Sequence, residues 1–80
     1  MLTGEQLKAA RALLRLEQRA VAGASGLSFE TIRRLEMTRG PISANTKTEE
    51  ALRRAYRELG VIFIDENGDG PGVRMRKGDV

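Results

Sequence analysis

Residues 18–36 read QRAVAGASGLSFETIRRLE. The alanine-rich first part predicts a short helix over residues 18–25, and Gly26 suits the left-handed conformation in which many helices end. Ser28 is a strong N-cap for a second helix, from residue 29 to about residue 37. The segment therefore predicts two short helices joined by a tight turn, with the second lying across the first.

Such a helix pair needs a small residue where the helices touch, a residue that permits the turn, and an apolar side facing a shared core. The residues that meet these needs are Ala22, Gly26, Val21, Leu27, Ile32 and Leu35. On the second helix the same spacing places Glu36 on the inner side. Glu30, Arg33 and Arg34 then lie around the outer side, facing water or a ligand.

Helices are also predicted on both sides of this segment. Thr3 and Gln6 form a capping-box pattern, and apolar residues at helical spacing extend the helix that follows for about three turns. Thr48 is predicted to open a fourth helix that ends at Gly60. Residues 42–47, which lie between, are expected to form a loop.

After Gly60 the pattern becomes that of strands. Residues 61–64 are apolar and β-branched, residues 73–76 alternate apolar and basic, and dense turn signals separate them. The sequence predicts a mainly α fold. A four-helix helix-turn-helix domain over residues 1–60 is followed by a short C-terminal β-strand pair over residues 61–80, with a frayed tail at 77–80.

The small size of the chain points to a partner subunit. It has 80 residues with no cysteine and no histidine, so neither a disulfide nor a usual zinc site can stabilise its core. A lone hairpin is marginally stable and its edges invite pairing, within the chain or between chains. We predict a homodimer built on the apolar residues of the two strands, which are Val61, Ile62, Phe63, Ile64, Val73 and Met75.

Charge and hydropathy limit the partners and the compartment. The net charge of +3 and the pI of about 10.0 favour a polyanion. Four arginines and only two acidic residues fall between residues 18 and 40. No apolar run approaches the ~20 residues that cross a bilayer, and no secretory leader pattern is seen. A cytoplasmic protein without a membrane partner or a cofactor is expected.

A family resemblance is carried by Ala10-Arg11, Leu16-Glu17-Gln18, Val21-Ala22, residues 25–28 and residues 31–36. With these residues the chain resembles the Xre family, the helix-turn-helix class of phage repressors and Cro. The resemblance implies a sequence-specific transcriptional regulator, a repressor by expectation. As a homodimer it would bind double-stranded DNA at an inverted-repeat operator, with a recognition helix in each major groove.

The resemblance also implies residue roles. Gln18 would contact a phosphate; Phe29, Glu30 and Arg34 would face base edges; Arg33, Arg39 and the polar loop would meet phosphates. The implied DNA-binding residues are Gln18, Ser28, Phe29, Glu30, Arg33, Arg34, Arg39, Asn45 and Lys47. Arg11 and Glu36 match positions that form an ion pair between the first and third helices. Arginine suits guanine, and a carboxylate suits the cytosine amino group.

Two alternatives concern the predicted site and its function. Phe29 either faces the bases or folds onto the core as a hydrophobic staple. The same fold can also serve an antitoxin or an anti-activator, which masks a protein partner. An enzyme is disfavoured, because the sequence holds no histidine, no cysteine and no nucleophile–base pair.

Two further patterns have simpler explanations. Residues 65–70 match the first half of a calcium-binding loop, but Arg76 stands where a bidentate glutamate is needed. A plain acidic turn is therefore favoured. The arginines of the fourth helix (residues 53, 54 and 57) and the basic residues 74, 76 and 77 are interpreted as solvated surface charge, with a basic arm on DNA as the alternative for the second group.

Overall fold

The computed structural model describes residues 1–78, which form four helices followed by two strands. The helices are α1 (Gly4–Leu14), α2 (Gln18–Ser25), α3 (Phe29–Glu36) and α4 (Thr46–Leu59), and the strands are β1 (Val61–Ile64) and β2 (Gly72–Met75). The prediction of a mainly α fold with a C-terminal strand pair is confirmed. The frayed tail predicted for residues 77–80 extends beyond the described residues.

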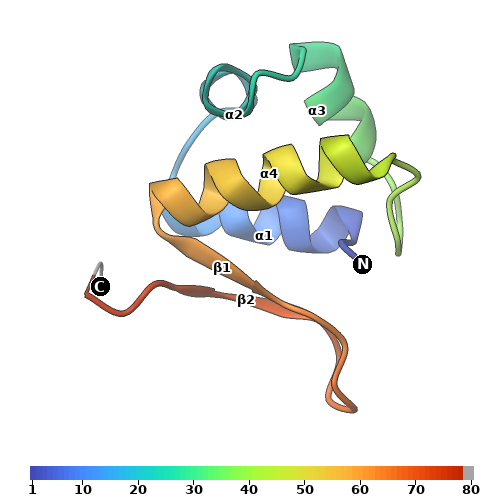
Figure 1. Cartoon of the computed structure of the whole chain (residues 1–80), viewed down its shortest axis with the longest axis vertical. Helices are drawn as coiled ribbons and strands as arrows, with labels where there is room; N and C mark the ends of the chain where they lie inside the picture. The colour runs from blue at the N-terminus through green and yellow to red at the C-terminus, as the bar shows by residue number, and fades with distance from the viewer. Residues whose placement is uncertain (79–80) are drawn as a thin grey trace.

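The elements lie at three levels (Figure 1). α1 and α4 occupy the middle, α2 and α3 lie on one side of them, and the strand pair lies on the other. In that view α2 is seen end-on while α3 runs downward at the upper right, so the two short helices lie crosswise. This arrangement separates the outer surface of α3 from the hairpin.

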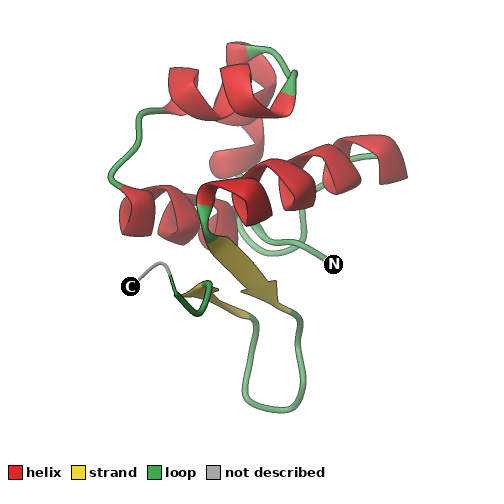
Figure 2. Ribbon diagram, turned by 60° about the vertical axis from the view of Figure 1, so that its left-hand side comes forward, coloured by secondary structure: helices red, strands yellow, loops and turns green. Residues whose placement is uncertain are grey.

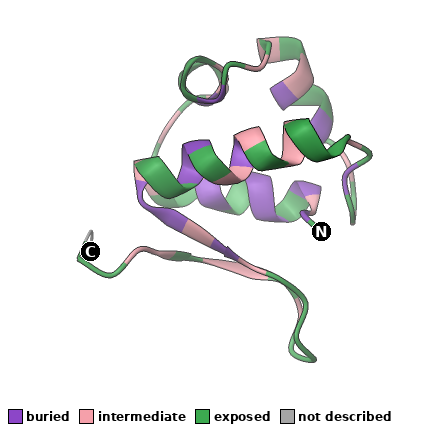
Figure 3. Cartoon of the chain, in the orientation of Figure 1, coloured by how far each residue is buried: buried purple, intermediate pink, exposed green. Residues whose placement is uncertain are grey.

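A single apolar core joins these levels (Figure 3), where buried segments face the interior. Leu35 of α3, Leu52 of α4 and Val61 of β1 are fully buried in it. The ring of Tyr56 packs edge-on against that of Phe63 with 5.3 Å between centroids, a favourable geometry for aromatic pairs. The core therefore takes side chains from both the helices and the hairpin.

The helix ends follow the predicted caps with one exception. Thr3 and Gln6 form the capping box of α1, the Ser28 side chain caps α3, and Gly26 ends α2 in the left-handed conformation with φ 77°. The prediction that Thr48 opens the fourth helix is wrong. α4 begins at Thr46, because the side-chain oxygen of Asn45 accepts the backbone N–H of Thr48 at 2.8 Å.

The two strands pair antiparallel within the chain, with Val61 opposite Met75 and Ile64 opposite Gly72. β2 begins one residue earlier than the predicted range of 73–76. The connecting loop projects away from the helices (Figure 2). Its own side chains close it: Glu66 accepts the backbone N–H groups of Gly68 and Gly70. Among residues 1–78, no group of three or more acidic side chains is placed to hold a metal ion.

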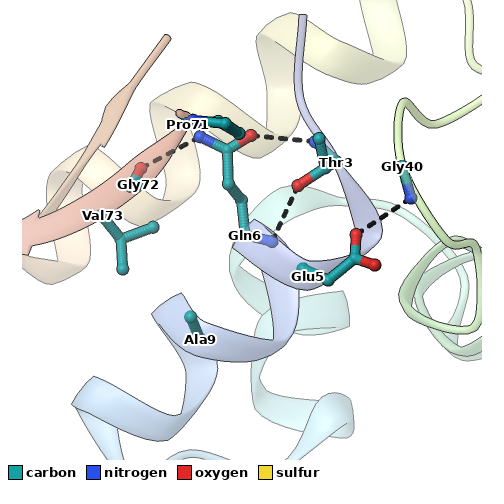
Figure 4. Close-up of a pocket in the computed structure, with 8 residues that line it drawn as sticks. All are labelled: Thr3, Glu5, Gln6, Ala9, Gly40, Pro71, Gly72 and Val73. Atoms are coloured by element: carbon teal, nitrogen blue, oxygen red, sulfur yellow. Dashed lines mark hydrogen bonds between the residues drawn. The ribbon is translucent and has the colours of Figure 1, made fainter. Parts of the chain in front are cut away.

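The hairpin is attached to α1 by Gln6, whose side chain is buried (Figure 4). Its amide nitrogen donates to the carbonyl of Ile64 at 2.9 Å and to that of Gly72 at 3.0 Å. Its amide oxygen accepts the backbone N–H of Thr3 at 2.9 Å. One side chain thus caps the helix and holds both strands, a role that its place in the capping box does not reveal.

The residues of the predicted dimer interface differ in their burial within the chain. Val61 and Phe63 are 0% and 9% exposed because they fill the core of their own chain. The prediction that both contact a second chain stays a prediction, and their side chains already pack within their own chain. Ile62, Ile64, Val73 and Met75 are half-buried, and their proposed role between chains stays a prediction.

Candidate nucleic-acid interface

The two sides of α3 differ sharply in exposure. Ile32, Leu35 and Glu36 are buried, and Glu30, Arg33 and Arg34 are exposed, as the apolar spacing predicted. The Ser28 hydroxyl fixes the start of the helix by accepting the N–H of Thr31 at 3.1 Å. α3 is thus a short, firmly capped helix that presents charged side chains outward.

The buried carboxylate of Glu36 ties three helices together. Arg11 of α1 donates to it through two nitrogens, at 2.8 and 3.0 Å. Gln18, the first residue of α2, donates to it at 3.1 Å. The Arg11–Glu36 ion pair implied by the family resemblance is present, and its hydrogen bonds raise the pKa of Arg11. The network fixes α3 relative to α1 and α2.

Phe29 makes a contact that the sequence did not predict. The guanidinium carbon of Arg19, from α2, lies 4.4 Å from the centre of the Phe29 ring. Such cation–π contacts hold an arginine side chain over the ring face. Phe29 is half-buried and joins the start of α3 to that of α2. Its role in DNA contact stays untested.

The outer surface of α3 is a shallow hollow of about 500 Å³, lined by Glu30, Thr31, Arg33, Arg34, Met37 and Thr38. Arg33 and Glu30 form an exposed ion pair at 3.3 Å. Within residues 1–78, no ion pair or hydrogen bond involves the side chain of Arg34. Its donors are therefore available to a ligand.

The sequence prediction missed Met37, which is 71% exposed. Met37 is the C-cap of α3. It lies three and four residues after Arg34 and Arg33, so helical spacing places it on the same surface. Continuing that spacing by one turn would have found it. The surface is thus partly apolar as well as charged.

The other predicted contacts lie around this surface. Arg39 and Lys47 are exposed, in the turn after α3 and the first turn of α4. Asn45 caps α4 through its side-chain oxygen. That side chain is therefore already engaged, as are those of Gln18 and Ser28. Glu30 and Arg33 pair with each other, and Phe29 contacts Arg19. Of the nine predicted DNA-binding residues, three have no side-chain hydrogen bond or ion pair within residues 1–78: Arg34, Arg39 and Lys47.

The turn after α3 is held to the N-terminal segment. Gly4 donates its N–H to the carbonyl of Gly40 at 3.0 Å, and the Glu5 carboxylate accepts the N–H of Gly40 at the same distance. That second hydrogen bond lowers the pKa of Glu5. The position of Arg39 is set by these contacts.

A scan against protein-family models and a search of the curated proteins both found no match to this chain. Among residues 1–78, no helix combines the length and the apolar character needed to cross a bilayer.

Proposed function

We propose that the chain is a sequence-specific DNA-binding protein, a transcriptional regulator of the Xre type that acts as a repressor. In this proposal α2 and α3 are the helix-turn-helix, and α3 enters the major groove. The observation that carries it is the exposed surface of α3, on which the donors of Arg34 are available while Glu36 fixes the helix from behind. Rigid presentation of an arginine suits base recognition.

Each side chain on this surface has a partner chemistry in the groove. Arg34 can donate two hydrogen bonds to one guanine, and Met37 can contact a thymine methyl group. Glu30 is paired with Arg33, and this pairing lowers the repulsion between the Glu30 carboxylate and the DNA phosphates. In the groove the carboxylate can accept a hydrogen bond from a cytosine amino group. The carboxylate on the reading surface is thus compatible with binding DNA.

The stack of Arg19 on Phe29 suggests a different role for Phe29. A guanidinium held over a ring can still donate its N–H groups to a phosphate. We assign Phe29 to positioning Arg19, so that it supports affinity without reading a base. Phe29→Leu should then weaken binding to cognate and scrambled DNA alike, by about 2- to 5-fold. A loss confined to cognate DNA would show that Phe29 contacts a base.

A homodimer is part of the proposal, because one α3 of eight residues spans only about 12 Å. Two such helices, ~34 Å apart, would read an inverted repeat. The outer surface of β1, with Ile62 and Ile64 half-buried, is the apolar surface available for the contact. Sedimentation should show a dimer at tens of micromolar, and a monomer there would exclude this part of the proposal.

The decisive experiment is selection of bound DNA from a random pool, followed by anisotropy titrations of cognate and scrambled duplexes. Arg34→Ala should lower cognate affinity by about 5- to 150-fold and relax specificity. Arg39→Ala should weaken both duplexes equally, because phosphate contacts carry no sequence information. Arg54→Ala, on the exposed side of α4, is the control and should change neither.

Salt dependence separates DNA binding from the alternative of a protein-masking antitoxin or anti-activator. A protein that neutralises several phosphates loses affinity steeply as salt rises. Absent or salt-independent binding of the wild-type chain to DNA would contradict the proposal and favour the protein-masking role.

A further inference from the structure

The free edge of β2 has unpaired backbone groups. Arg76 donates its backbone N–H to the carbonyl of Gly60 at 2.6 Å. At this position the backbone N–H and C=O groups of β2's chain segment therefore point toward β1. Because the direction alternates along an antiparallel pair, the N–H and C=O groups of Val73 and Met75 point away from β1. Within residues 1–78 no hydrogen bond to these groups is found.

A groove of about 370 Å³ runs beside this edge (Figure 4). It is lined by the N-terminal segment and α1, by the turn after α3 and by the start of β2. The lining residues are Thr3, Glu5, Gln6, Ala9, Gly40, Pro71, Gly72 and Val73. α1 continues along the same direction with Leu13, one turn beyond Ala9 and 43% exposed. Since residues four apart share a helix face, the groove borders a further apolar surface that the chain leaves uncovered.

We propose that this groove and the β2 edge bind an extended segment of a partner protein, which adds to the sheet as a third strand. The segment alternates apolar and acidic side chains. Strand addition of this kind takes its affinity from backbone hydrogen bonds and its specificity from alternate side chains. The proposal does not depend on DNA binding.

The required side chains follow from the two faces of β2. Val73 and Met75 pack against the core, so alternate residues of an added strand would face the apolar groove. Arg74 lies opposite Ile62 on the outer face and is exposed. The remaining residues of an added strand would lie beside Arg74, where a carboxylate is favoured and a cation is not.

A second copy of this chain fits the edge poorly in the register that centres the contact on Arg74. If two β2 strands pair about a two-fold axis with Val73 opposite Met75, each Arg74 lies directly opposite the other. Like charges placed directly opposite across a strand pair are destabilising. Pro71, just before β2, has no N–H and limits the added strand to a short segment. The partner is therefore a short acidic and apolar strand.

The hairpin and α3 occupy opposite sides of the middle level (Figure 1), and the groove reaches the turn after α3 only at Gly40, next to Arg39. A segment bound there leaves Arg34 uncovered. The partner would then be attached to the protein without covering the exposed surface of α3.

The test titrates the full ¹⁵N-labelled chain with two short capped peptides, in which valine alternates with glutamate or with lysine. The glutamate peptide should shift the amides of Val73 and Met75 and slow their hydrogen exchange. It should bind about five-fold more tightly than the lysine peptide. Methylating its pairing backbone nitrogens should abolish binding.

Protein variants then assign the surface. Arg74→Glu should reverse the order of affinity of the two peptides, so that the lysine peptide binds more tightly. Arg54→Glu on α4 should leave the order of affinity unchanged. Leu13→Glu, at an exposed position, should weaken binding of the glutamate peptide. Absence of amide shifts at Val73 and Met75, or an unchanged order in Arg74→Glu, would overturn the proposal. Protection of these amides that grows with protein concentration alone would also overturn it, by showing that a second copy occupies the edge.

Discussion

Replacing Arg11 with methionine removes the charged partner of a carboxylate that is almost wholly buried. The Glu36 side chain is 3% exposed, and that of Arg11 is 28% exposed. Breaking a buried pair in this way destabilises a protein by about 3–5 kcal/mol. We expect about 3 kcal/mol, the lower end, because Gln18 still donates to the carboxylate at 3.1 Å.

That loss is large for this chain. An 80-residue domain typically unfolds with about 4–12 kcal/mol. At about 4–8 °C per kcal/mol for a domain of this size, Arg11→Met should lower the melting temperature by about 12–24 °C. Urea unfolding followed by circular dichroism gives the free energy, and a thermal scan gives the melting temperature.

The matched control is the double variant Arg11→Met/Glu36→Leu, which removes the buried charge together with its partner. Replacing a buried ion pair by apolar residues is often close to neutral, so the double variant should recover most of the lost stability. A loss below about 1 kcal/mol in Arg11→Met would refute the reasoning. A double variant no more stable than the single one would do the same, because the uncompensated charge would not be the cause.

Three further predictions concern stability. A Cβ at Gly4 would overlap the Thr38 carbonyl oxygen, whereas a Cβ at Gly23 meets nothing. In urea unfolding, Gly4→Ala should therefore destabilise the protein by about 1–3 kcal/mol, and Gly23→Ala should stabilise it by about 0.5–1 kcal/mol. Equal effects of the two substitutions would contradict this. Burial raises the pKa of Tyr56, the one tyrosine of the sequence. Its contribution to the free energy of unfolding is therefore complete below its unfolded pKa of about 10 and is lost as the pH rises above that value. Between pH 8 and 11, Tyr56→Phe should lose less stability than the wild type. Gln6→Met should speed the hydrogen exchange of the amides in both strands, whereas Gln18→Met should leave that exchange unchanged. Slow exchange in both variants would mean that the hairpin does not depend on Gln6.

Much of the candidate site follows from local sequence signals. The exposed positions of Arg33 and Arg34 and the buried position of Glu36 follow from helical spacing alone, and Ser28 was recognisable as a cap. The partners of these side chains could not be predicted from these local signals. Phe29 meets Arg19, ten residues earlier, because α2 and α3 lie crosswise. Spacing along one helix carries no information about a contact between two.

By itself the sequence determined the elements and the sides they bury, because caps, glycine stops and apolar periodicity act within a few residues. The competition between Asn45 and Thr48 for the start of α4 shows the limit of those signals, since both are good caps and one turn separates them. Only the tertiary structure decided where the hairpin packs. Gln6 reaches strands 58 and 66 residues away, and Val61 and Phe63 pack into the core of their own chain. Such long-range contacts depend on how all the elements fill one small core together.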